Sequence, residues 1–287
     1  MDQRFQKLRE MEAFTDALFD RIFSFQERKH AAWDAAAPFD TRIQNIALHN
    51  LIFSNPDRDP KTSGPTVAHF YPLREENRAM AYYAKQAAEN PTVLDVHGRN
   101  GFVGSLLARE GLKVIGLRNP AEKPNQIPDF FDADVYEMRD GTLADIDQQV
   151  DVAFCAWMPS GVNVTPEIVA LNPKMIIYVY TEHVNEHSKE RQTGTEEAFD
   201  DLPHNYRIVD EWEILRPENL LQEVWPDLSP SLEEKRIVRI YADESVVDIP
   251  LYGVEEMAVP YDWEADLEMA LLALEAKSNL RARGIVV

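Results

Sequence analysis

The chain has 287 residues, of which 45% are hydrophobic and 10% aromatic, so its composition excludes a disordered protein and allows a packed core. Its 29 lysines and arginines against 50 aspartates and glutamates give a formal net charge of -21 at pH 7. This charge excludes a generic nucleic-acid binder, because phosphate backbones are bound by lysine and arginine that replace released counterions. Its only cysteine, Cys155, cannot form an internal disulfide bond.

Residues 1–72 are predicted to form an N-terminal helical cap. Apolar side chains recur every three or four positions from Phe5 to Phe23 and again from Ile43 to Ile52. The first residues lack the apolar block of a secretory signal, and no apolar run approaches the ~18–20 residues that span a bilayer. We therefore expect a cytoplasmic protein without a membrane partner.

From residue 92 onward the pattern changes to short apolar runs separated by helical stretches, which is typical of strands buried on both faces of a parallel sheet. The last two runs have no helix-length segment between them, so they are expected to pair antiparallel. Over residues 73–245 we predict an α/β, Rossmann-like domain with a seven-stranded, mostly parallel sheet and helices on both faces. The expected strands are 92–96, 113–117, 134–137, 150–156, 175–180, 206–214 and 235–241, and a helix is expected before them at 74–89.

Residues 246–287 are predicted to form a C-terminal extension that ends in a helix. Acidic residues from Asp262 precede basic residues up to Arg283, and Gly284 follows, as the helix dipole and C-terminal capping favour. Leucines spaced at three or four residues from Leu267 to Leu274 give this helix an apolar stripe. The stripe is explained by packing within the chain, and a homodimer contact or a lid stays open as an alternative.

The most informative segment is the turn after the first predicted strand, which reads V-L-D-V-H-G-R-N-G-F-V-G over residues 93–104. Glycines are needed where a backbone bends sharply and approaches a nucleotide, because a Cβ atom has no room there. The helix that follows offers its positive end to polar groups of a ligand. The segment therefore predicts a ligand site at the carboxyl end of the first strand.

This segment resembles the first motif of class I S-adenosylmethionine-dependent methyltransferases, an acidic residue followed after one position by three alternating glycines. Asp95 takes the acidic position and Gly101 the third glycine, whereas His97 and Arg99 replace the first two. The resemblance implies S-adenosylmethionine as the cofactor and methyl transfer as the activity. The residues expected to bind the cofactor are Asp95, His97, Gly98, Gly101, Arg118 and Asp140.

Two of these assignments depend on later strands. In the family an acidic residue at the end of the second strand holds the ribose hydroxyls, and here Leu117, Arg118 and Asn119 occupy that place. A further acidic residue lies near the adenine in the family, and Asp140 is the match.

The acceptor side is expected around the end of the fourth strand, where the sequence reads Trp157-Met158-Pro159. Amino-directed family members carry Asp or Asn at this loop, and its absence here argues against a nucleobase amine as acceptor. We expect an unidentified small-molecule acceptor bound by Tyr71, Trp157 and Glu182. No catalytic residue is assigned, and Trp157 is equally compatible with a place in the core.

Two alternatives remain open. Gly98, Gly101 and Gly104 fit the G-x-x-G-x-x-G loop of NADP-binding reductases, with Arg118 placed to meet a 2′-phosphate. The late position of the loop in the chain, the short helix after it and the lack of a following Tyr-x-x-x-Lys pair argue against a reductase. The second alternative is a methyltransferase fold with a decayed cofactor loop that acts as a binding or scaffold protein.

A zinc motif is also present in outline, because residues 183–187 read H-x-x-E-H. Its neighbours are all polar, and Gly194 would end any helix carrying it. The context favours a solvated loop, so no metal site is expected.

Overall fold

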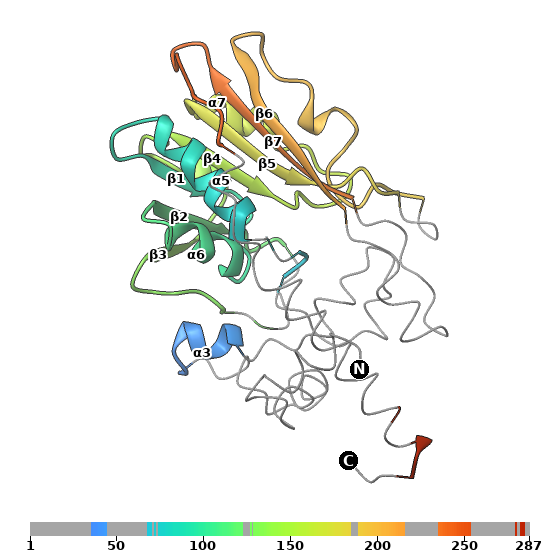
Figure 1. Ribbon diagram of the computed structural model, residues 1–287. Helices are drawn as coiled ribbons and strands as arrows, with labels where there is room; N and C mark the ends of the chain where they lie inside the picture. Colours follow the sequence, from blue (N-terminus) through green and yellow to red (C-terminus); the bar gives the residue numbers. More distant parts are fainter. Residues whose placement is uncertain are drawn as a thin grey trace.

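The computed structural model is built around a seven-stranded sheet in the order β3-β2-β1-β4-β5-β7-β6 (Figure 1). The first five strands run parallel to one another, and β7 pairs antiparallel with both β5 and β6. The predicted seven-stranded, mostly parallel sheet with a final antiparallel pair is thus confirmed. The strands are β1 (Thr92–Asp95), β2 (Lys113–Arg118), β3 (Tyr136–Asp140), β4 (Val152–Ala156), β5 (Met175–Tyr180), β6 (Tyr206–Leu215) and β7 (Lys235–Asp243).

The structure describes residues 36–44, 68–70, 72, 74–122, 127, 129–184, 189–215, 235–253, 279 and 282–284. Most of the predicted N-terminal cap and of the C-terminal extension, together with Tyr71, lies outside these residues. The division of the chain at residues 72 and 245 therefore stays a prediction.

The core consists of two apolar clusters, one on each face of the sheet. Residues at alternate positions along a strand belong to different clusters, because successive side chains point to opposite faces. Helices α5 (Arg74–Gln86) and α6 (Phe102–Ala108) pack on one face with Val93. Helix α7 (Thr165–Ala170) contributes Ile168 to the cluster that contains Leu94. Every residue of β4 and β5 is buried, which explains the continuous apolar runs by which the sequence revealed them.

The expected alternation of strand and helix is incomplete. Among the described residues, no α-helix connects β2 to β3, and only the 3-10 turn η3 (Leu143–Asp145) lies between β3 and β4. Proline at positions 120, 124 and 128 removes backbone donors and opposes a helix in the first of these connections. A second 3-10 turn, η4 (Glu197–Phe199), precedes β6.

A short helix from the N-terminal region, α3 (Phe39–Gln44), packs against the loop that leads into β3. The ring of Phe39 lies 5.8 Å from that of Phe130 and 6.4 Å from that of Phe102 at the start of α6. Arg109, at the end of α6, forms an ion pair with Asp40. This part of the N-terminal region therefore lies beside α6 (Figure 1).

None of the described helices is long and apolar enough to cross a membrane.

Candidate functional site

The glycine loop connects β1 to α6 and lies at the carboxyl ends of the parallel strands. The amide of Gly98 donates to the carbonyl of Leu117 at 2.8 Å, and a Cβ on Gly98 would lie only 2.9 Å from that oxygen. Gly101 begins α6 with a φ of +83°, a left-handed conformation that favours glycine. Both glycines are thus explained by the backbone path of the loop itself.

A cavity of about 30 Å³ lies between this loop, the end of β4 and the segment 68–70. One buried water needs ~10–15 Å³, whereas pockets for small-molecule ligands measure ~300–1,000 Å³. The cavity therefore has room for water but not for a nucleoside. Its lining residues are Ala68, His69, Phe70, Asp95, His97, Gly98, Arg99, Asn100, Val103, Ala156 and Trp157.

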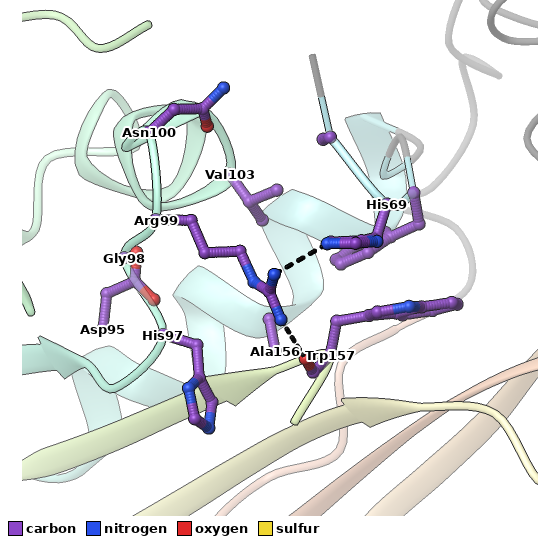
Figure 2. A pocket seen from close by; sticks show the side chains of 11 residues that line it. His69, Asp95, His97, Gly98, Arg99, Asn100, Val103, Ala156 and Trp157 are labelled. Carbon is purple, nitrogen blue, oxygen red and sulfur yellow. Dashed lines mark hydrogen bonds between the residues drawn. The ribbon is translucent and has the colours of Figure 1, made fainter. Parts of the chain in front are cut away.

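Arg99 fills the space above the glycine loop. Its Nη2 donates to the Trp157 carbonyl at 3.0 Å, and its Nη1 lies 2.8 Å from His69 Nε2. Figure 2 shows the guanidinium between these two residues, with the His97 imidazole pointing away from them. Arg99 and Trp157 have φ values of 48° and 56°, so both sides of this contact adopt a backbone conformation that non-glycine residues rarely take. The buried Nε of Arg99 has no hydrogen-bond partner among the described residues.

The outer wall of the cavity is a stack of aromatic rings. The Trp157 ring lies 6.4 Å from that of His69 and 5.2 Å from that of Phe70, at interplanar angles of 11° and 24°. The Arg236 guanidinium lies 5.1 Å from the Phe70 ring and makes two hydrogen bonds, of 2.9 and 2.6 Å, to Glu76 in α5. The wall thus brings together the segment 68–70, the residue that follows β4, and β7.

Asp95 lies beneath the loop and is fully enclosed by protein, with 2% of its surface exposed. Its Oδ2 accepts a hydrogen bond of 2.9 Å from the Tyr136 hydroxyl. Burial raises the pKa of Asp95 to about 7, although the Tyr136 hydrogen bond and the Arg99 charge oppose this shift. The site therefore holds a carboxyl group that takes up or releases a proton near neutral pH.

His97 is oriented by an acidic residue from the loop after β2. Its Nδ1 lies 3.1 Å from Glu122 Oε1, and its buried Nε2 has no partner among the described residues. Burial opposes ionisation of Glu122, but the hydrogen bond to His97 and the charges of His97 and Arg99 prevail and lower its pKa. The cavity lining thus combines the Asp95 carboxyl group, the Arg99 guanidinium and the imidazoles of His69 and His97, and Glu122 contacts His97 from outside the lining.

His69 is neutral in this arrangement, because its Nε2 must accept the hydrogen bond that Arg99 donates. Desolvation and the Arg99 charge lower the pKa of His69 to about 3.

Four of the residues predicted for the site, Asp95, His97, Gly98 and Trp157, line the cavity together. Arg118 does not line it but supports the loop, since its Nε donates to the Arg99 carbonyl at 3.0 Å. Gly101 lies behind the lining, at the start of α6.

The remaining predicted residues lie away from the cavity. Asp140, the last residue of β3, has a carboxylate 3.9 Å from Arg118 Nη1, with a largely exposed side chain. Glu182, after β5, is exposed and is not part of the lining. Tyr71 lies outside the described residues. Their roles in binding stay predictions.

Glu122 is the site residue that the sequence did not reveal. It follows β2 in a connection without apolar periodicity, and no spacing rule ties it to His97. Arg99 stood out in the sequence as a departure from the glycine motif, but no pattern in the sequence pairs it with His69.

Among the described residues, no group of three His, Cys, Asp or Glu side chains is arranged to hold a metal ion. Most of the H-x-x-E-H segment lies outside them. Cys155 is buried within β4, and burial raises the pKa of its thiol.

Comparison with known proteins gives similarity only at the level of solved structures. No protein-family model and no curated protein sequence matches the chain. A 1,6-didemethyltoxoflavin-N1-methyltransferase from Burkholderia thailandensis, solved with its toxoflavin ligand and S-adenosylhomocysteine, is 15% identical over 72% of this chain and 91% of that chain (TM-score 0.37).

Two further structures are similar to the same extent. A precorrin-6y C5,15-methyltransferase from Geobacter metallireducens is 14% identical, covering 58% of this chain and 87% of that chain (TM-score 0.36). The YcgJ protein from Bacillus subtilis is 10% identical, covering 58% and 97% (TM-score 0.40).

Proposed function

We propose that this protein is an S-adenosylmethionine-dependent methyltransferase that acts on a small-molecule acceptor. One observation carries the proposal: the loop from Asp95 to Gly101 lies at the carboxyl end of the central strand β1, beside the end of β4. Ligands of doubly wound sheets bind in the crevice outside the carboxyl ends of the strands. The residues that resemble the methyltransferase motif thus lie where such a fold binds ligands.

The residues around the cavity suit S-adenosylmethionine in chemical kind. Arg99 offers a guanidinium to a carboxylate, His97 offers a buried ring nitrogen, and Trp157 offers an apolar wall. The cavity of about 30 Å³ is too small for such a molecule, so binding requires the side chains that line it, Arg99 among them, to move. The fit therefore depends on a rearrangement of side chains.

When bound, the cofactor supplies an electrophilic methyl group on a sulfonium sulfur. The methyl group needs no further activation, so the chain's task is to align the acceptor and to exclude water. Trp157 and Phe70 exclude water from one side of the cavity. Asp95, enclosed below the loop, holds a proton near neutral pH and limits the negative charge close to the reacting groups.

A specific observation favours a second candidate, a binding or scaffold protein with a decayed cofactor loop. Arg99 lines the cavity in place of a motif glycine. Arg118 stands where an acidic residue is expected in the family and is paired with Asp129, with Nη2 and Oδ1 at 2.5 Å. A reductase is the weaker alternative, since the chain lacks a Tyr-x-x-x-Lys pair after the glycine loop.

The test is a thermal-shift and calorimetric titration of the full chain with S-adenosylmethionine, S-adenosylhomocysteine and NADPH. A ligand that binds only the folded state stabilises it by about 2.7 kcal/mol at a hundredfold excess over Kd. We expect saturable stabilisation by the first two ligands. Stabilisation by NADPH alone would support the reductase. The absence of stabilisation by all three ligands would support the scaffold protein.

The matched control for the site is a pair of glycine variants. Gly98→Val places a side chain against the Leu117 backbone and is expected to abolish binding. Gly253→Val meets nothing within 4 Å and is expected to bind as the wild type does.

A further inference from the structure

We infer that Arg99 selects for a ligand that carries a carboxylate, and that its contact with His69 is a latch that keeps the cavity closed until such a ligand arrives. The inference rests on the proposed function, whose cofactor carries an amino-acid carboxylate. It goes beyond that function by assigning a recognition residue and a closing contact to the site.

The first step is that the guanidinium is held by weak partners. It donates to an imidazole nitrogen and to a peptide carbonyl, both uncharged, and its buried Nε is unpaired among the described residues. A carboxylate makes shorter, stronger and bidentate hydrogen bonds to a guanidinium. An incoming carboxylate would therefore satisfy Arg99 better than His69 does.

The second step concerns the charge of the ligand. Asp95 and Glu122 both lie within electrostatic reach of Arg99, and each interacts favourably with its positive charge. A dianionic phosphate would add two negative charges beside Glu122, which is ionised at neutral pH, and beside Asp95, which is partly ionised there. A single carboxylate matches the single guanidinium, so the surroundings of Arg99 favour a carboxylate over a phosphate.

The two partners of Arg99 differ in their exposure to solvent, and this difference determines where the latch opens. His69 is exposed, whereas Trp157, the residue that follows β4, is buried. The hydrogen bond from Arg99 joins the segment 68–70 to the glycine loop, and both residues of this bond line the cavity (Figure 2). Breaking it frees the guanidinium to turn and frees His69 to move off the Trp157 ring. The weaker anchor is thus on the solvent side.

Two ligands separate recognition from opening. S-adenosylhomocysteine carries the amino-acid group, and 5′-methylthioadenosine is a similar nucleoside thioether without it. Any change in the ease of opening affects both dissociation constants equally, so their ratio isolates the contribution of the amino-acid group. The ratio is measured by calorimetry for the wild type, Arg99→Met, Arg99→Lys and His69→Ala.

We expect Arg99→Met to reduce the preference for S-adenosylhomocysteine by roughly 10- to 100-fold, as the loss of a charged hydrogen bond implies, and Arg99→Lys to restore part of it. His69→Ala is expected to keep the ratio of the two dissociation constants and to lower each of them by at least about threefold. The reason is that the contact between Arg99 and His69 no longer holds the cavity closed against the ligand. Arg109→Met and His204→Ala change the same residue types at exposed positions and serve as controls. An unchanged ratio in Arg99→Met, or unchanged affinities in His69→Ala, overturns the inference.

Hydrogen exchange without ligand tests the latch independently of the cofactor. Arg99→Met should speed exchange in peptides covering residues 68–70, and His69→Ala should speed it in peptides covering residues 97–101, whereas neither control variant should do so. If no ligand binds but this mutual effect is present, the latch stands and the proposed cofactor falls. If exchange is unchanged in both variants, the latch is rejected whatever the ligands do.

Discussion

The Tyr136 hydroxyl in β3 donates a hydrogen bond of 2.9 Å to the Asp95 carboxyl in β1, although β2 lies between these two strands. The contact crosses β2 at Gly116, where an added Cβ would lie 1.6 Å from the Tyr136 oxygen. It also passes Gly104 of α6, whose Cβ would lie 2.3 Å from Asp95 Oδ2. Two glycines outside the loop are therefore as necessary to the site as those within it.

The first prediction concerns Gly116→Ala. The new methyl group cannot coexist with Tyr136 in its present position, so we expect a loss of folding free energy of about 2 kcal/mol or more, in the range of overpacked cores. Urea denaturation measures it. Gly253→Ala, which meets nothing within 4 Å, is the control and should change stability little. Combining Gly116→Ala with Tyr136→Leu should recover part of the loss. Equal stabilities of the two alanine variants would contradict the packing.

The second prediction is a pH dependence that belongs to Asp95. Its pKa rises from 3.8 in a free side chain to about 7 in the folded protein. The folded state therefore binds this proton more tightly than the unfolded state, and stability from this group is lost as pH rises from about 4 to about 7.

Asp95→Asn removes this titration while its amide oxygen still accepts from Tyr136. We expect the stability of the variant relative to the wild type to increase as pH rises from 5 to 8. The midpoints of urea denaturation at several pH values measure this difference. Parallel pH profiles of the two proteins would contradict the assignment.

The third prediction concerns the buried ion pair between Glu76 and Arg236, whose side chains are 1% and 3% exposed. Glu76→Gln removes the negative charge that Glu76 places against the Arg236 guanidinium, and breaking a buried ion pair in this way costs about 3–5 kcal/mol. Glu137→Gln breaks an exposed pair with Arg139 and should cost less than about 1 kcal/mol. Thermal and urea denaturation of both variants measure the contrast. A cost for Glu76→Gln no larger than that of the control would contradict the role of this pair.

The fourth prediction concerns acid conditions. The hydrogen bond and charge of His97, together with Arg99, outweigh burial and hold the pKa of Glu122 below its usual 4.5. Its contribution to stability is thus present above pH 4.5 and is lost as pH falls through the folded-state pKa. Glu122→Gln should be less stable than the wild type at pH 6, and the difference should shrink toward pH 3. A difference that stays constant with pH would show that the carboxylate charge is not involved.

The sheet was predictable because burial on both faces leaves a plain signal. The run at residues 175–180 coincides with β5 at both ends, since all six of its residues are buried. The strand at 134–137 was placed two residues early, because only Tyr136 of β3 is buried and the exposed positions carry no apolar signal. The helices expected between β2, β3 and β4 are not found among the described residues of these connections, and prolines at positions 120, 124 and 128 oppose a helix in the first of them.

The site could be predicted only where its residues lie close together in the sequence. Gly98 and Asp95 stand in one short segment, so the glycine motif indicated both. The partners of Arg99 come from 30 residues before it and 58 residues after it in sequence, and their meeting depends on the path of the segment 68–70 over the end of β4. No spacing rule describes such a meeting.

The position of β7 between β5 and β6 has a consequence for how the chain is made. β5 can complete its hydrogen bonding only when residues 235–243 have left the ribosome, although its other neighbour, β4, is present much earlier. During that interval a strand with six apolar positions has an unpaired edge, which is a template for aggregation. Fragments that stop before Lys235 should therefore precipitate or recruit chaperones during synthesis, even when they contain every residue of the glycine loop.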